Sequence, residues 1–382
     1  MKLAFQLAYR NLMGAGLRTI LNSAVLSLSF VIIIFFNGII DGWDNQARRE
    51  SIKWEFGNGQ VLHEEYDPQD PFTIQDAHGT YPDDPTLNPI LLVQGSIYPK
   101  GRMMSIVLKG IKTDQEILAI PTNLLASTDA EIPVLIGKRM AEAAKLAVGD
   151  NLLLRWRDKN GTFDAQNITI AAIFDTDVGT VDNGQVWLDI EKLWAMTGLQ
   201  SEATMLIASE DKPYDISGWN YRSQDNLLQE LTDIITMKKS SGLILYGLLM
   251  TIALLAIFDT QVLSIFRRQK EIGTYIALGM TRLSVIRLFT VEGSMYSIFA
   301  MILGSLYGIP LLLYLSKTGI GMPAASMDMG VTLAERIYPI YGVGLILGTI
   351  VIIVLSATIV SFLPTRKISR LDPVDAIKGK VI

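Results

Sequence analysis

The chain has 382 residues, of which 49% are apolar and 19% are charged, with a net charge of −5 and a mean hydropathy of +0.32. Disordered chains combine low hydrophobicity with high net charge, so this composition excludes a disordered chain. The acidic balance argues against a nucleic-acid partner. The sequence contains no cysteine, which excludes disulfides, thiolate-bound metals and thiol catalysis.

Four apolar stretches are long enough to cross the hydrocarbon core of a bilayer, which takes about 20 residues. We predict transmembrane helices over residues 20–42, 239–266, 285–315 and 337–363. Residues 1–19 should form an amphipathic helix ahead of the first stretch. No small-x-small cleavage site follows that stretch, so we expect a retained anchor rather than a signal peptide.

The basic residues are distributed unevenly along the chain. Segments 1–19, 264–288 and 364–382 together carry 13 basic and three acidic residues, whereas segment 41–240 carries 18 basic and 31 acidic residues. Loops rich in Lys and Arg stay in the cytoplasm. We therefore expect both termini, the loop 267–284 and the tail 364–382 to be cytoplasmic. Residues 43–238 and the short loop 316–336 should then lie outside.

The outside segment 43–238 is predicted to be a folded, mixed α/β domain. Apolar runs and alternating patterns indicate strands, and apolar residues at helical spacing indicate helices. The expected strands are 105–108, 151–156, 168–174 and 204–207, and the expected helices are 137–146 and 189–197. Turn signals at 148–150, 159–161 and 182–184 separate them. Residues 66–89 should form an extended loop, and 223–239 a helix that continues into the second span.

Motifs for catalysis are missing from the sequence. It has no phosphate-binding G-x-x-x-x-G-K-[ST] loop, no G-x-S-x-G elbow and no H-E-x-x-H pair. Its two histidines, His63 and His78, lie in one polar stretch and make a poor metal site. We therefore expect a chain that is not an enzyme and that holds no metal or cofactor of its own.

Two acidic residues fall near the ends of apolar stretches. Asp259 and Glu292 are candidate functional groups because carboxylates are rare inside a membrane. We favour the simpler interpretation, in which both lie at interfacial depth and bond to neighbouring Arg or Ser side chains. The pairs Gly304/Gly308 and Gly344/Gly348 should allow close helix packing within the molecule.

Three stretches of the sequence carry a family resemblance. Residues 266–282 read FRRQKEIGTYIALGMTR, residues 8–12 read AYRNL, and residues 364–377 read PTRKISRLDPVDAI. These stretches resemble the FtsX/MacB-like (type VII) permeases of ABC transporters, whose loop pattern is R-x-x-E-I-G-x-x-x-A-x-G. A weaker match covers residues 134–150. The layout is closest to that of the lipoprotein-releasing LolC/LolE permeases. It implies a bacterial inner-membrane protein with four helices and a periplasmic α/β core domain between the first two.

The resemblance also implies a coupling helix and a separate ATPase subunit. A coupling helix in the loop would contact the ATPase through residues that match the family pattern: Arg267, Arg268, Glu271, Ile272, Gly273, Ala277 and Gly279. Two copies of a separate ATPase subunit would bring ATP and Mg, and a second permease, identical or homologous, would complete the unit. Some relatives fuse the ATPase to the permease N-terminus. Because the chain begins at Met1 with KLAF, we expect no such fusion.

The work done outside the membrane has three candidate forms. The first is lipoprotein release, supported by FNGIID at 36–41 and by GWNY at 218–221. In that case Phe30, Phe35, Phe36 and Ile40 are candidate contacts for acyl chains and membrane lipid, and a periplasmic chaperone or adaptor is a further partner. The alternatives are MacB-type efflux of peptides or drugs, and an FtsX-type scaffold that activates cell-wall hydrolases. A membrane receptor is disfavoured because the cytoplasmic parts are short.

Overall fold

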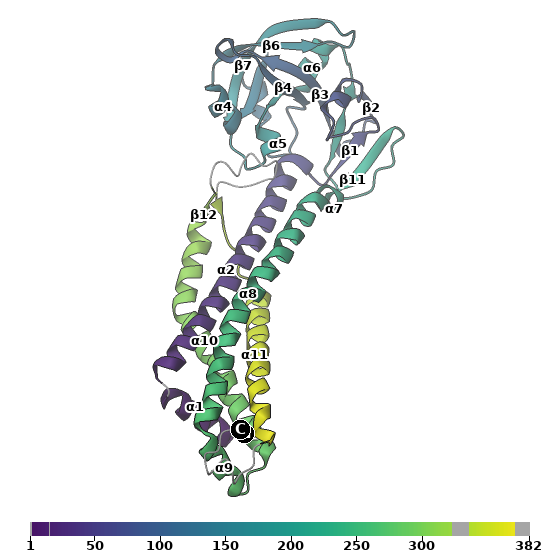
Figure 1. Ribbon diagram of the computed structural model, residues 1–382. Coiled ribbons are helices and arrows are strands. Elements are labelled where there is room, and N and C mark those ends of the chain that lie inside the picture. The colour runs from purple at the N-terminus through teal and green to yellow at the C-terminus, as the bar shows by residue number, and fades with distance from the viewer. Residues whose placement is uncertain (1, 15, 323–335, 371–382) are drawn as a thin grey trace. The chain divides into compact units, whose positions relative to one another are not determined.

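The computed structural model describes residues 2–14, 16–322 and 336–370 (Figure 1). These residues fall into two compact units. The helical unit comprises Met1–Gly42, Ile235–Ile320 and Tyr338–Ile382, and the α/β unit comprises Trp43–Ile234 and Gly321–Ile337. The C-terminal motif that begins at Pro364 is therefore described only as far as Arg370, and the rest of it lies outside the described residues.

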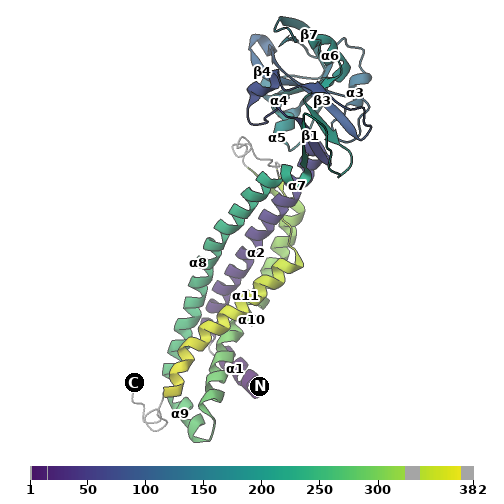
Figure 2. The same ribbon diagram turned by 90° about the vertical axis from the view of Figure 1, so that its right-hand side faces the viewer.

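Long apolar helices build the helical unit (Figure 2). Its helices are α1 (Lys2–Gly14), α2 (Leu17–Ser51), α8 (Gln229–Arg267), α9 (Gln269–Ala277), α10 (Arg282–Thr318) and α11 (Val343–Thr365), followed by the 3₁₀ turn η5 (Arg366–Arg370). Among the described residues, four helices are long and apolar enough to cross a membrane, namely those that contain α2, α8, α10 and α11. Four candidate membrane helices with a large α/β domain between the first two confirm the predicted fold class.

Glycines bring α10 close to α2. A Cβ at Gly304 would meet the Phe30 ring at 3.1 Å, and one at Gly308 would meet Val31 at 2.8 Å. Close packing within the molecule is therefore confirmed for this pair, because only a hydrogen side chain leaves room for the neighbouring helix. Gly344 and Gly348 differ, since no atom lies within 4 Å of the position of their Cβ.

The fourth span starts later than the sequence predicts. Helix α11 begins at Val343 rather than at residue 337, because residues 338–341 cross α2 as extended chain. The backbone N–H of Ile340 donates to the Gly38 carbonyl at 2.9 Å, and the Tyr341 ring fills the space where a Cβ of Gly38 would stand. The expected start was wrong because apolar composition alone does not distinguish a packed loop from a helix.

Six strands of the α/β unit close into a ring. The nine-stranded sheet runs β11-β1-β10-β3-β4-β8-β5-β7-β6, and β6 also pairs with the end of β3. The ring therefore contains β3, β4, β8, β5, β7 and β6, which form a small barrel filled by side chains. Strands β10, β1 and β11 extend the sheet from the first half of β3. The strands of this sheet are β1 (Gly59–His63), β3 (Leu87–Ile97), β4 (Met104–Ile111), β5 (Pro133–Gly137), β6 (Asn151–Arg157), β7 (Phe163–Phe174), β8 (Gln185–Asp189), β10 (Met205–Ala208) and β11 (Trp219–Ser223).

Two large hydrophobic clusters form most of the core of this unit. One contains Leu108, Val134, Leu154, Trp156 and Val186 and belongs to the barrel strands. The other packs Trp54 and Phe174 against the opposite face, with their rings stacked at 5.7 Å. Burial in β6 alternates strictly between exposed and buried residues, which is the pattern of a strand with one face in a core.

The shorter elements agree with most of the sequence predictions. Strands β4, β6, β7 and β10 and helices α4 and α6 cover the expected ranges to within a few residues at each end, β7 alone beginning five residues early. Residues 66–89 differ from an extended loop, since they contain a 3₁₀ turn, a short strand and the start of β3. The short elements are η1 (Ile52–Phe56, π-helical), η2 (Pro71–Gln75), β2 (Gly79–Thr80), η3 (Pro99–Gly101), α3 (Asn123–Ala126), α4 (Lys138–Ala144), α5 (Gly179–Asp182), α6 (Ile190–Thr197), β9 (Glu202–Ala203), α7 (Gln224–Leu227), β12 (Ile320–Gly321) and β13 (Arg336–Ile337).

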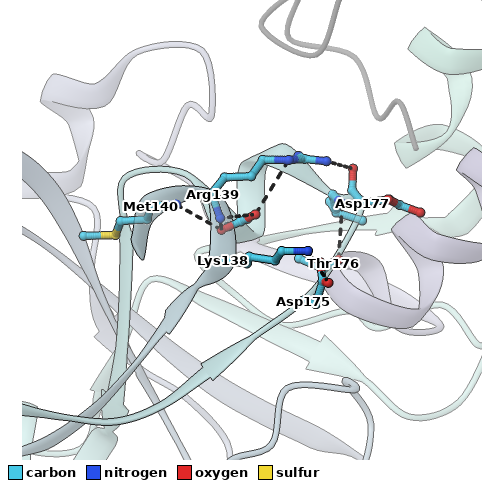
Figure 3. A network of polar contacts seen from close by, with 8 residues as sticks. Lys138, Arg139, Met140, Asp175, Thr176 and Asp177 are labelled. Atoms are coloured by element: carbon cyan, nitrogen blue, oxygen red, sulfur yellow. Dashed lines mark hydrogen bonds and ion pairs between the residues drawn. The ribbon is translucent and has the colours of Figure 1, made fainter. Parts of the chain in front are cut away.

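A network of polar contacts surrounds Lys138, Arg139 and Met140 at the start of α4 (Figure 3). Asp182 is fully buried, and its Oδ1 accepts from the Arg139 N–H at 3.1 Å and the Met140 N–H at 3.5 Å. These are N–H groups that a helix start leaves unpaired. A Cβ at Gly137 would collide with Asp182, so this contact accounts for the glycine in the 134–150 stretch. Burial raises the pKa of Asp182, while its hydrogen bonds with Arg139 and Met140 oppose the rise.

Candidate functional site at the α8–α10 connection

Helix α9 is a short, well-terminated element between the ends of α8 and α10 (Figure 1). Its last residue, Ala277, is followed by Leu278 and then by Gly279, which has φ +95°. The Gly279 N–H donates to Ile276 O and the Met280 N–H donates to Tyr275 O, both at 3.0 Å. This pair of bonds is a Schellman motif, which uses glycine because its φ disfavours other residues. Thr281 then caps α10 by accepting from the Ser284 N–H at 3.3 Å.

The inner face of α9 packs against its own unit. Ile272 is fully buried in a cluster with Val285, Phe289 and Ile368, and Gly273 is buried beside it. These contacts tie α9 to the first turns of α10 and to η5. Ile272 and Gly273 therefore position the helix, and they offer no exposed surface to a partner.

Arg268 joins three helices at the start of α9. Its Nη1 donates to both carboxylate oxygens of Glu292, at 2.9 and 3.1 Å, and its Nε donates to Glu271 Oε2 at 2.7 Å. Asn11 of α1 donates to the same Glu292 at 3.0 Å. The guanidinium lies 4.8 Å from the centre of the Phe289 ring. Glu292 is only 5% exposed, so this network provides the charge partner that a buried carboxylate requires.

The outer face of α9 is exposed and chemically mixed. Lys270, Glu271, Thr274 and Ala277 are exposed, and Leu278 at the end of the helix is 79% exposed. Arg267, immediately before the network, is also exposed. An apolar tip among charged and polar groups on a rigidly held helix is suited to fit a groove on another protein. The arrangement thus separates a positioning face from a face available for contact.

The two membrane carboxylates have different surroundings. Glu292 pairs with Arg268, which is the kind of partner that the sequence analysis favoured. Asp259 is exposed on α8 and has no hydrogen bond or ion pair among the residues that the structure describes. The expected bond between Asp259 and a neighbouring Arg or Ser is therefore not present in that part of the chain.

The candidate acyl-chain contacts on α2 include one buried residue and three that are at least partly exposed. Phe30 is buried between α2 and α10 and lies in the core of the helical unit. Phe36 is 40% exposed, and its ring meets that of Phe35 at 5.4 Å. Phe35 and Ile40 are half-buried. Phe30 therefore serves packing, and the other three keep surface at which an apolar ligand has access.

Helices α2 and α8 are tied together within each unit, a feature that sequence analysis missed. In the helical unit, Lys239 Nζ lies 2.7 Å from Asp41 Oδ1. In the α/β unit, Arg48 Nη2 donates to Thr232 Oγ1 at 2.7 Å while Asp44 holds the same guanidinium. Elsewhere in the α/β unit, Gln224 of α7 donates to the carbonyl of Gly57, the residue after η1, at 2.8 Å. No sequence signal relates these pairs, which are separated by about 170 to 200 residues.

Over residues 2–14, 16–322 and 336–370, no group of three or more His, Asp or Glu side chains stands close enough to hold a metal ion. His78 instead pairs with Glu202, and His63 meets the Trp219 ring edge-on at 5.4 Å.

Comparisons with known proteins found one matching family model and two similar relatives. Residues 243–373 match the family model described as FtsX-like permease C-terminal. The chain is also similar to the lipoprotein-releasing system transmembrane protein LolC from two strains of Xylella fastidiosa, Temecula1 and 9a5c. Each is 24% identical over 276 residues, covering 65% of this chain. The chain thus spans 65% of the length of these curated relatives.

Proposed function

We propose that this chain, which is similar to FtsX-like permeases over residues 243–373 and to LolC over 65% of its length, is the membrane subunit of an ABC transporter that releases lipoproteins. In this proposal a separate ATPase subunit, present in two copies, supplies ATP and Mg. A second permease, identical or homologous, completes the transporter. The loop with α9 and both termini face the cytoplasm of a bacterial inner membrane, and the α/β unit faces the periplasm.

The observation that carries the proposal is the two-faced α9. Its inner face is fixed by Ile272 and by the Arg268–Glu292 network, while Lys270, Thr274 and Leu278 remain exposed. A helix that must pass on a push from a partner needs both properties. A loosely held helix would absorb the movement, and a fully buried one would have no contact surface.

The contacts between α2 and α8 would pass a movement of α9 on to the α/β unit. Helix α9 follows α8 after one residue, and α8 is linked to α2 through Lys239–Asp41 and through Thr232–Arg48. Both helices continue along the chain from the helical unit into the α/β unit. We propose that ATP-driven closure at α9 shifts α2 and α8 together, and that the α/β unit follows.

Lipoproteins are the proposed cargo because the relatives are named for lipoprotein release and because α2 retains accessible apolar side chains. Phe36 and its neighbours Phe35 and Ile40 would receive acyl chains, each buried methylene contributing about 0.8 kcal/mol. A periplasmic chaperone or adaptor would take the released lipoprotein.

A depletion experiment tests this cargo. Cells depleted of the chain should accumulate outer-membrane lipoproteins in the inner membrane, measured by membrane fractionation. Expression of the wild-type chain should restore sorting, whereas Phe36→Asp should not. Phe163→Asp, a change at a similarly exposed phenylalanine of the α/β unit, is the matched control and should restore it. Normal lipoprotein sorting in depleted cells would refute the proposed cargo.

A further inference from the structure

The α/β unit contains a polar pocket that the transport proposal does not use. It has a volume of about 230 Å³ and lies among η1, β1, β4, β8, β11 and α7. Its charged lining includes Glu55, Lys109, Arg222 and Glu230. All of these residues belong to the α/β unit, so the pocket is a feature of that unit alone.

Three hydrogen-bond donors lining this pocket make no hydrogen bond or ion pair with the residues that the structure describes. They are the ammonium of Lys109 and the hydroxyl of Tyr66, both half-buried, and the exposed guanidinium of Arg222. Lys109 has only the Trp187 ring, 4.8 Å from its Nζ. Burial lowers the pKa of Lys109, partly opposed by the charge of Glu55, and burial with nearby acids raises the pKa of Tyr66 to about 12. A partly desolvated ammonium gains most from a nearby anion.

The acidic groups leave those donors available. Glu55 accepts from Thr180 Oγ1 at 2.7 Å, and its interaction with Lys109 is one of charge alone, with no ion pair between them among the described residues. Glu230 is exposed at the rim. Two cations and two carboxylates give the lining little net charge, which favours a single negative charge over a doubly charged phosphate.

Apart from Gln60 and Asn226, the rest of the wall is apolar. Trp187, Leu62, Ile90 and Met205 line the pocket beside the donors. Small-molecule sites combine such a wall with a few convergent polar groups. The volume lies below the range of about 300–1,000 Å³ for drug-sized ligands, so the occupant is a small molecule or the end of a chain.

We infer that this pocket binds a small organic carboxylate, with the carboxylate held by Lys109, Arg222 and Tyr66 and a short aliphatic part resting on Trp187. The carboxylate would belong either to a free acid or to the C-terminus of a peptide. Binding at this site does not depend on the proposed transport function.

The test uses the full chain in lipid nanodiscs and ligand-observed NMR titration. The first probe is isocaproate, and its neutral control is isocaproamide, which has the same shape without the charge. We expect saturable binding of isocaproate, and binding of the amide weaker by about tenfold or more, because a hydrogen bond to a charged group contributes at that level. Lys109→Met and Arg222→Gln should each weaken isocaproate binding by a similar factor. Lys112→Met, an exposed lysine three residues further on, should leave it unchanged.

A second pair of probes distinguishes the source. A tripeptide ending in leucine is titrated with a free and with an amidated C-terminus. Tighter binding of the free tripeptide than of isocaproate supports a chain terminus, and weaker binding supports a free acid. The inference fails if isocaproate does not bind or if the amide binds equally well. It also fails if inorganic phosphate, measured by displacement of isocaproate, binds more tightly than isocaproate does. It also fails if Arg222→Gln, a rim change that leaves the core intact, has no effect on binding.

Discussion

Replacing Arg268 by methionine tests whether the network at α9 holds this helix in place. The change keeps an apolar stem against Phe289 but removes both hydrogen bonds to Glu292. Glu292 would remain 5% exposed with Asn11 as its partner. Removing one partner of a buried ion pair costs about 3–5 kcal/mol. The Arg268 side chain is 18% exposed, so we expect the lower end of that range, about 3 kcal/mol.

A double-mutant cycle separates the ion pair from other effects of the substitution. Glu292→Met alone leaves Arg268 paired with Glu271 and should cost less than Arg268→Met. The double variant contains no unpaired buried charge and should recover most of the stability, since replacing both partners of a buried pair with apolar residues is often neutral. The assay is thermal unfolding of the detergent-purified chain. A double variant as unstable as the sum of the two single variants would refute the reasoning.

Three further predictions concern other parts of the chain. Gly279→Ala should destabilise the end of α9 by about 1–2 kcal/mol through backbone strain at its positive φ, and it should reduce stimulation of the partner ATPase in a coupled assay. Gly344 has equally open space and no positive φ, so Gly344→Ala should have neither effect. Burial raises the folded-state pKa of Asp182 above its ordinary value of 3.8, so its stabilising contribution is greatest below that pH and declines as the pH rises through the folded pKa. The free energy of unfolding, measured by denaturation, should therefore fall for the wild type relative to Asp182→Asn between acidic and neutral pH. A difference between the two proteins that stays constant with pH would contradict this. Cysteines at positions 160 and 274, in a chain that has none of its own, should react with membrane-impermeant reagent in intact spheroplasts only at position 160.

The local structure of α9 could be predicted from the sequence because its signals are local. Gly279 ends the helix and Thr281 opens the next one, as the residue types and their spacing indicate, and the structure shows the bonds that fix both. Several strands of the α/β unit were found for the same reason. In β6, for example, the alternation of buried and exposed residues is visible directly in the sequence from Asn151 to Arg157.

Relations between distant residues could not be predicted in this way. Glu292 meets Arg268 across 24 positions and Asn11 across 281, and no periodicity connects them. Closure of the barrel depends on Gly95–Ile97 of β3 pairing with β6, which a single sequence does not reveal. The pocket around Lys109 brings together η1, β4 and α7, so its lysine looks in the sequence like any strand residue.

The central claim is that the outer face of α9 docks on an ATPase, and a photocrosslinker at position 278 tests it most directly. The crosslinking amino acid would replace Leu278 in the chain expressed at native level in intact membranes, with Val148, an exposed residue of the α/β unit, as the matched control position. The account predicts that mass spectrometry identifies a nucleotide-binding ABC ATPase crosslinked to position 278 and none crosslinked to position 148. Crosslinks from position 278 to lipid or to other proteins alone would contradict it.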